Sequence, residues 1–354
     1  MEMKKLEEKK HASLKKGGVW IPSPLALDRK KKPSEKWQRL LTLYYIRAGA
    51  RAIVPGAHTG EFSGGDLGIY SYWLELIKEM VAQHGGNDMF LMSAISGKGY
   101  MKQAELAAKC GYDIVMLAPT AFTKKSDAEV IRIFRDVASV IPVFGFELQT
   151  LVPGSREFNY RLWEKIFTIT YGAKSAPFNT YRAQVMLSAA ANSKRRDELV
   201  LVTGNDDRIV SDLGGVFPFK VGSEIVKVGY SGGLLGHFAT DTYAAVRWAG
   251  AVRESKTGGT WKLAVSEREL AHIVSMCNGA LFDAVTDFAN SVWGVKYRLY
   301  SLGLLPGPFC FHENGRRGLA EEIDTAYSID PVISDRDILS QTLNDLKREV
   351  GMLS

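Results

Sequence analysis

The feature that most constrains the fold of this chain is a regular alternation of short apolar runs with longer segments of helical periodicity. Eight runs read as strands, at residues 18–22, 52–55, 89–95, 113–117, 142–146, 167–173, 199–203 and 225–230. Amphipathic segments lie between them, at residues 35–48, 70–83, 101–109, 128–140 and 181–191. This order is typical of βα units around a parallel sheet. We therefore predict an α/β protein with a (β/α)8 TIM barrel.

An open, doubly wound sheet is the structural alternative, but no GxGxxG motif follows an early strand to support a dinucleotide site. Beyond about residue 252 the strand signal stops, and residues 266–288 and 335–350 read as helices. The expected organisation is a basic N-terminal tail over residues 1–17, the barrel over residues 18–252 and a C-terminal helical extension over residues 253–354.

The composition and charge favour an ordinary globular protein. The chain has 354 residues, of which 46% are hydrophobic and 24% charged, enough to bury a large core. The net charge of +6 could suggest a nucleic-acid partner. However, much of the basic excess stands in clusters near the N-terminus, such as residues 29–32, that are not interleaved with aromatic residues. We interpret these clusters as a solvated tail and loop.

Cysteine usage and hydropathy indicate the compartment. Cys110, Cys277 and Cys310 stand far apart and form no CxxC pair, which suggests neither a disulfide framework nor a thiolate zinc site. Residues 1–16 have no apolar h-region, and nowhere do eighteen apolar residues run together. We expect a cytoplasmic protein that has neither a membrane nor a nucleic-acid partner.

Lys174 is the main candidate for chemistry. It follows the apolar run at residues 167–173, where the sixth strand should open onto the active-site face of the barrel. A lysine held there away from water can be partly neutral and attack a carbonyl carbon. The expected chemistry is a Schiff base with a 2-oxo acid. The alternative is a solvated loop lysine just past a strand.

Two other strand ends supply candidate groups. The turn after the second strand contains His58, Thr59 and Gly60, and its N–H groups and threonine hydroxyl could bind a carboxylate. It could also be an ordinary tight turn. Glu147, at the end of the fifth strand, could accept and return protons if burial raises its pKa, or could pair with Lys174 and keep it charged.

The loops after the seventh and eighth strands leave further alternatives open. Asn205 could bind a substrate hydroxyl in a metal-free site. Asp206 and Asp207 could instead hold a divalent metal, or could cap the next helix. The glycine-rich segment 231–237 either binds phosphate or allows close packing.

Together these residues resemble the dihydrodipicolinate synthase and N-acetylneuraminate lyase superfamily over roughly residues 18–250. The turn at residues 57–61, Ala-His-Thr-Gly-Glu, is similar to the family's Gly-Thr-Thr-Gly-Glu carboxylate-binding motif. Lys174 falls where the Schiff-base lysine belongs, and residues 204–207 resemble the family's Gly-Asp-Asp turn. The resemblance implies a barrel that forms an imine with pyruvate or a related 2-oxo acid, and commonly self-associates.

The chain also departs from the family pattern. Phe146 and Glu147 stand where the family has a proton-relaying tyrosine, His58 replaces the first threonine of the turn, and segment 118–122 lacks the second tyrosine of the relay. The arginine that synthases use to bind their second substrate has no secure counterpart, since Arg156 would require a shifted alignment. These departures favour a related reaction over dihydrodipicolinate synthesis.

The resulting hypothesis is a class I lyase, an aldolase or dehydratase acting on a 2-oxo acid. Lys174 would attack the 2-oxo carbon, Thr59 and Gly60 would hold the carboxylate, and Glu147 with His58 would serve as acid and base. This scheme needs no cofactor and no metal. The rivals are a metal-dependent barrel lyase and a barrel that binds a 2-oxo acid without catalysis. By resemblance, the expected partners are a small 2-oxo acid and further copies of the chain, in a dimer or tetramer.

Overall fold

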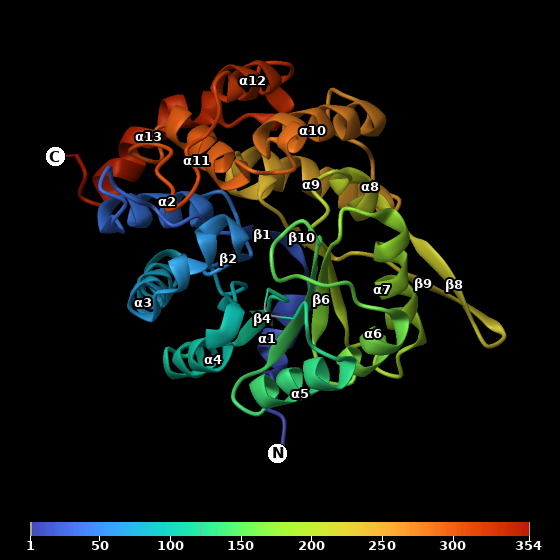
Figure 1. Cartoon of the computed structure of the whole chain (residues 1–354). Helices are drawn as coiled ribbons and strands as arrows, with labels where there is room; N and C mark the ends of the chain where they lie inside the picture. Colours follow the sequence, from blue (N-terminus) through green and yellow to red (C-terminus); the bar gives the residue numbers. More distant parts are fainter. Residues whose placement is uncertain (1, 121, 354) are drawn as a thin grey trace.

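The computed structural model describes residues 2–120 and 122–353, except for the side chains of residues 62–64, so residue 121 of segment 118–122 lies outside the described residues. As predicted, eight parallel strands form a nearly closed barrel (Figure 1). They are β1 (Gly18–Pro22), β2 (Ala52–Val54), β3 (Met92–Ile95), β4 (Ile114–Leu117), β5 (Val143–Leu148), β6 (Gly172–Ala176), β7 (Val200–Thr203) and β10 (Gly232–Leu234). The two ends of the ladder meet where the Ala94 N–H donates to the Pro55 carbonyl at 2.8 Å.

Helices surround the barrel, and polar caps fix where several of them begin. They are α2 (Glu35–Arg47), α3 (Leu67–His84), α4 (Tyr100–Lys109), α5 (Asp127–Ala138), α6 (Tyr160–Phe167), α7 (Thr180–Asn192), α8 (Ile209–Gly214) and α9 (Thr242–Lys256). A capping box between Ser126 and Glu129 starts α5, and the Asp66 side chain accepts two backbone N–H groups at the start of α3. A 3-10 helix, η1 (His58–Gly65), joins β2 to α3.

Side chains alternate along the strands between the inside of the barrel and the surrounding helices, so the strands contribute to a core on each face. Trp20, Phe144 and Val202 belong to the cluster inside the barrel, whereas Ile21 and Leu201 pack outward against the helices. Because large side chains fill the inside, the barrel is a packed core and not a pore. A ligand site must therefore lie at one end of it.

Two predicted strands are wrong in detail. Residues 225–230 do not form the eighth barrel strand: β8 (Phe217–Val221) and β9 (Glu224–Val228) pair as an antiparallel hairpin that projects from the barrel (Figure 1). The eighth barrel strand is β10, which pairs with β1 and β7. The sixth strand begins at Gly172 and not at residue 167, so Lys174 lies in the middle of β6.

The N-terminal residues are not simply a solvated tail. Helix α1 (Glu8–Lys15) lies within residues 1–17, and Leu6 and Leu14 are buried with the residues inside the barrel. The Leu6 N–H also donates to the Tyr171 hydroxyl at 2.9 Å, just before β6 begins. This segment therefore closes the amino end of the barrel.

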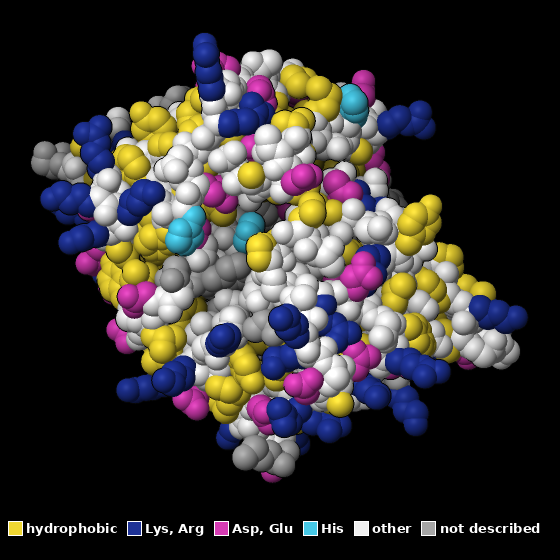
Figure 2. Space-filling view, in the orientation of Figure 1, with side chains coloured by type: hydrophobic (Ala, Val, Ile, Leu, Met, Phe, Trp, Pro, Cys, Tyr) yellow, Lys and Arg dark blue, Asp and Glu magenta, His cyan; other side chains and the backbone are white. Residues whose placement is uncertain are grey.

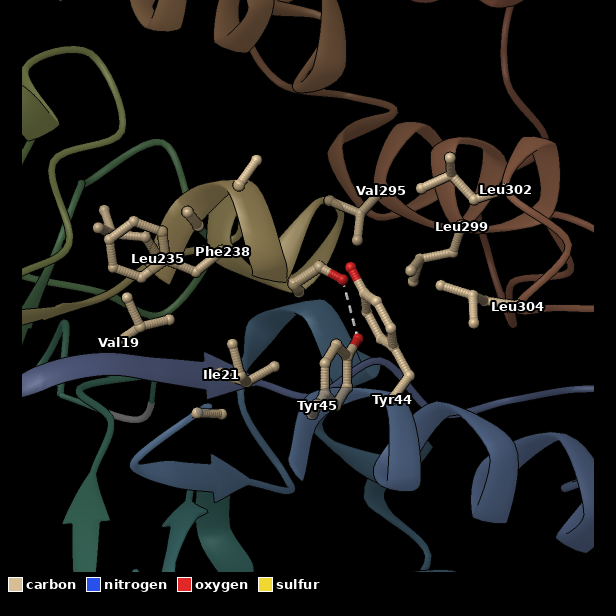
Figure 3. Close-up of a cluster of buried hydrophobic side chains, with 14 of the residues drawn as sticks. Val19, Ile21, Tyr44, Tyr45, Leu235, Phe238, Val295, Leu299, Leu302 and Leu304 are labelled. Atoms are coloured by element: carbon tan, nitrogen blue, oxygen red, sulfur yellow. Dashed lines mark hydrogen bonds between the residues drawn. The ribbon is translucent and has the colours of Figure 1, made fainter. Parts of the chain in front are cut away.

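The C-terminal extension packs against α2 and α9, on the side of these helices that is away from the barrel strands (Figure 1). It contains α10 (Glu267–Leu281), η4 (Ala284–Thr286), α11 (Ser291–Ser301), α12 (Leu319–Ala326), η5 (Pro331–Ile333) and α13 (Arg336–Glu349). Val295 and Leu299 of α11 share a buried cluster with Tyr44 and Tyr45 of α2 (Figure 3). The boundary predicted at residue 252 falls inside α9, and the helix predicted over residues 266–288 ends at Leu281.

The surface carries both signs of charge. Lys and Arg side chains are spread over the face shown in Figure 2 and alternate with acidic side chains. Within the described ranges, no helix combines the length and the apolar character needed to cross a membrane.

Candidate active site

A cavity of about 290 Å³ lies at the carboxyl end of the barrel strands. The barrel contributes Lys174, Asp206, His58 and Thr59 to its wall, and the C-terminal extension contributes residues between 282 and 313. Its size is close to the lower end of the roughly 300–1,000 Å³ range of small-molecule sites. The cavity therefore suits a short substrate.

Lys174 points inward from β6 and is only 9% exposed. Its Nζ lies 4.5 Å from the centroid of the Phe146 ring, and a Cβ on Gly204 would overlap its Cε. Burial lowers the pKa of the Lys174 ammonium to about 8, although the charge of Asp206 opposes this shift. A substantial share of this amine is therefore neutral near physiological pH.

Asp206 is the acidic partner of this lysine. Burial raises the pKa of its carboxyl to about 7, against the opposing charge of Lys174. The His237 N–H donates to Asp206 Oδ1 at 3.2 Å, and Asn278 Nδ2 of α10 donates to the Asp206 carbonyl oxygen at 2.5 Å. Asp206 reads from the sequence as a helix cap or a metal ligand, although the similarity of residues 204–207 to the family turn pointed to this position.

His58 and Thr59 lie on the cavity wall, as the sequence predicts. Burial, assisted by the charge of Lys174, lowers the pKa of His58 to about 4, so its imidazole is neutral at pH 7. The Thr59 hydroxyl donates to the Pro22 carbonyl and would have to rotate to bind a carboxylate. Gly60 instead serves the turn: its N–H donates to the Ala57 carbonyl at 3.0 Å.

Asn205 is engaged in holding the loops together. Its Oδ1 accepts the Phe178 N–H at 3.1 Å, and its Nδ2 donates to Asp212 at 3.0 Å. It is fully buried between the loops that follow β6 and β7. These two hydrogen bonds engage both ends of the Asn205 amide, and its contact to a substrate hydroxyl stays a prediction.

The Glu147 side chain lies on the outer face of β5, whereas the predicted acid and base would have to point into the barrel. Because Phe146 faces the inside of the barrel, the next side chain faces the helices. Its carboxylate accepts from Arg182 at 3.0 Å, from Trp163 Nε1 at 3.3 Å and from the Phe158 N–H at 3.2 Å. Glu147 therefore holds α6 and α7 against the barrel and does not meet Lys174.

We expect the Glu147→Gln variant to lose stability and keep the chemistry of Lys174. Removal of a buried charge that accepts three hydrogen bonds should cost about 1–3 kcal/mol of unfolding free energy. Urea unfolding measures that cost, and borohydride trapping with pyruvate measures the adduct on folded protein. A stable variant that forms no adduct would restore Glu147 as the acid and base.

The extension adds polar groups that the sequence analysis missed. Ser291 and Glu313 line the cavity from α11 and from the loop before α12. The extension is anchored beside them by Glu61, which accepts Lys296 Nζ at 2.8 Å and the Phe311 N–H at 2.7 Å. No local signal marked these residues, because they stand far along the chain from the barrel motifs.

Asp206 and Asp207, the two candidate metal ligands, lie in different surroundings. Asp206 faces Lys174, and Asp207 is exposed. Within residues 2–120 and 122–353, no group of three or more His, Cys, Asp and Glu side chains could hold a metal ion.

Comparison with known proteins gives structural matches only. No family model matches the chain, and no curated protein matches it. Among solved structures, dihydrodipicolinate synthase from Bacteroides thetaiotaomicron is 16% identical, with a TM-score of 0.70 over 88% of this chain and 98% of its own. YagE, a prophage protein of the dihydrodipicolinic acid synthase family from Escherichia coli K12 solved with pyruvate, is 14% identical, with a TM-score of 0.71 over 88% and 97%.

A third match is CdNal from Clostridium difficile, solved with mannosamine, which is 13% identical with a TM-score of 0.66 over 88% of this chain and 98% of its own. Each match spans nearly the whole of the solved protein. The likeness therefore includes both the barrel and part of the helical extension. The chain therefore shares the fold of these solved proteins, two of which are a dihydrodipicolinate synthase and a member of the dihydrodipicolinic acid synthase family, at 13–16% sequence identity.

Proposed function

We propose that this protein is a Schiff-base-forming lyase that acts on pyruvate or a related 2-oxo acid, as an aldolase or dehydratase. The observation that carries the proposal is the buried Lys174, whose pKa burial lowers to about 8, in a cavity at the carboxyl end of the barrel. At pH 7 roughly a tenth of such a lysine is neutral, compared with far less than a hundredth of an ordinary one. This fraction is available to attack a carbonyl.

Each step can be assigned to groups in the cavity. Asp206 accepts the proton that Lys174 must lose, since burial pushes the pKa values of the two groups toward each other. The amine lone pair then attacks C2 of the 2-oxo acid, and the carbonyl oxygen takes up two protons, one lost by the attacking nitrogen and one returned by Asp206. The C2–O bond breaks with loss of water, and the resulting iminium accepts the electron pair released by carbon–carbon cleavage or by loss of a proton from C3.

His58 is the group we propose for proton transfer at the carbonyl oxygen. Phe146 stands over Lys174 where the superfamily has a tyrosine, so that position supplies no hydroxyl. The neutral imidazole of His58 lies on the same cavity wall and close enough for the lysine charge to lower its pKa. A neutral imidazole can accept a proton and return it.

Borohydride trapping tests the proposal. The protein is incubated with pyruvate, reduced, digested and analysed by mass spectrometry. We expect a reduced pyruvate adduct on Lys174 and none on Lys256, a second partly buried lysine that lies away from this cavity. Pyruvate binding without an adduct would favour a non-catalytic binding barrel. Turnover that chelators abolish would favour a metal-dependent lyase.

The pH dependence of imine formation tests the pairing of Lys174 with Asp206. The rate should rise as pH increases through about 8, because the amine must lose its proton before it attacks. Asp206→Asn removes a negative charge that raises the pKa of Lys174, so the midpoint of this rise should move to lower pH by roughly 1 unit. The initial rate of adduct formation with pyruvate, measured from pH 5 to 10, gives both midpoints.

Asp207→Asn is the matched control, because Asp207 follows in the same turn and is exposed. Its midpoint should stay close to that of the wild-type protein. A midpoint that moves upward in Asp206→Asn would show that Asp206 is not paired with this amine. We also propose that the protein forms a homo-oligomer, which sedimentation velocity tests directly.

A further inference from the structure

The C-terminal extension supplies further polar groups to the wall of the cavity. Ser291, the first residue of α11, is 7% exposed and lines the cavity. Among the described residues, its Oγ has no hydrogen-bond partner. A buried hydroxyl without a partner is costly and uncommon in folded proteins. The Ser291 hydroxyl therefore marks a place where a polar group of a ligand would fit.

Glu313 lines the same cavity next to Ser291. Its Oε2 accepts the N–H of Trp293 at 2.7 Å, and Trp293 is only two residues beyond Ser291 in α11. Burial raises the pKa of the Glu313 carboxyl to about 7, and the negative charge of Glu61 adds to that shift. A carboxyl in this position is stabilised in its ionised form by a neighbouring cation.

The charges around the cavity favour the same kind of ligand. Of the described residues on its wall, Lys174 is the one Lys or Arg, while Asp206, Asp287 and Glu313 are acidic. Under the proposed function Lys174 becomes a cationic iminium, whose charge is balanced by the carboxylate of the 2-oxo acid. A second negative charge on the substrate would therefore meet carboxylates with no cation left on the wall to balance it.

Lys296, a buried cation of the extension, does not change this balance. Lys296 is fully buried, and its Nζ donates to Glu61 and to the Phe309 carbonyl, each at 2.8 Å. Its charge is thus already compensated. At Glu313, the effect of Glu61 outweighs that of Lys296.

We propose that Ser291 and Glu313 form a subsite for a positively charged, hydrogen-bond-donating group on the part of the substrate distal to its 2-oxo carbon. This inference rests on the proposed function, because the imine on Lys174 fixes one end of the substrate. It narrows the substrate class to 2-oxo acids, or their aldol fragments, that carry an amino or guanidino group.

The test uses two 2-oxo acids that differ in charge and have nearly the same shape. They are 5-guanidino-2-oxopentanoate, whose distal group is cationic, and 2-oxo-5-ureidopentanoate, whose distal group is neutral and retains N–H donors. The third compound is 2-oxoadipate, whose distal group is a second carboxylate. Each competes with pyruvate for borohydride trapping on Lys174. In the wild-type protein we expect the guanidino compound to compete about tenfold better than the ureido compound, and 2-oxoadipate to compete least.

Three variants test which residues cause the preference for the guanidino compound. Glu313→Gln keeps an acceptor for the Trp293 N–H but removes the charge, so the two isosteric compounds should compete about equally. Ser291→Ala should weaken both by roughly threefold and leave their ratio unchanged. Glu321→Gln, which changes an exposed carboxylate of α12, is the matched control and should retain the tenfold preference.

The outcomes separate this inference from the proposed function. If pyruvate gives no adduct, the lyase proposal fails, and calorimetric titration with the same three compounds still measures the subsite. If pyruvate is trapped but the wild-type protein does not prefer the guanidino compound, the subsite proposal is wrong and the lyase proposal stands. A preference that persists in folded Glu313→Gln would likewise overturn the role of Glu313.

Discussion

The Lys174→Ala variant should form no borohydride-stable adduct with pyruvate and should lose turnover by about 10⁴-fold or more, because Lys174 is the one lysine among the described residues that line the cavity. Its fold should persist. When Lys174 is removed, Asp206, whose pKa burial already raises to about 7, can take up a proton, so no uncompensated charge stays buried. Mass spectrometry after reduction measures the adduct, and thermal unfolding followed by circular dichroism measures the fold.

Two further variants make this result specific. Lys174→Arg retains the positive charge beside Asp206, but a guanidinium stays protonated and cannot attack a carbonyl, so it should also be inactive. Lys98→Ala changes an exposed lysine that follows β3 and should keep the full adduct yield. Turnover of a 2-oxo acid by folded Lys174→Ala would end the Schiff-base proposal.

The second large effect concerns stability. Lys296→Met should lower the free energy of unfolding by about 3–5 kcal/mol, because it leaves Glu61 buried with an uncompensated charge. Lys296 is fully buried and Glu61 is 6% exposed at its side chain, with 2.8 Å between Nζ and Oε2. Urea unfolding of the wild-type and variant proteins measures the difference.

A double variant separates the loss of this ion pair from a change in packing. Lys296→Met combined with Glu61→Gln removes both charges and should recover a large part of the lost stability. If the double variant is as unstable as Lys296→Met alone, the cost comes from the shape of the new side chain. If Lys296→Met itself costs less than about 1 kcal/mol, the pair does not anchor the extension.

The sequence was sufficient for the architecture and for placing Lys174 on the sixth strand, because both rest on strong local patterns. The eighth strand was misplaced because Glu224–Val228 contains β-branched residues in the alternation typical of a strand, although it belongs to an exposed hairpin. The true strand, Gly232–Leu234, is short and glycine-rich and has almost no strand signal.

The candidate site was predicted less completely, for two physical reasons. Every residue of β5 is buried, so burial on both faces hides which of Phe146 and Glu147 points inward. If the expected register of β5 is shifted by one residue, the inward and outward directions of these two side chains are exchanged. Ser291 and Glu313 reach the cavity only through the packing of the extension on the barrel, which no local pattern in one sequence can specify.

The two ends of the chain complete opposite ends of the barrel, and this has a consequence for the order of events during synthesis. Glu61 in the turn after β2 finds Lys296 and Phe311 only after a further 235 and 250 residues have been added. Chains emerge from the ribosome N-terminus first. A nascent barrel that already contains Lys174 therefore lacks the part of the cavity wall that Ser291 and Glu313 supply. The complete cavity forms only when the last part of the chain packs on the barrel.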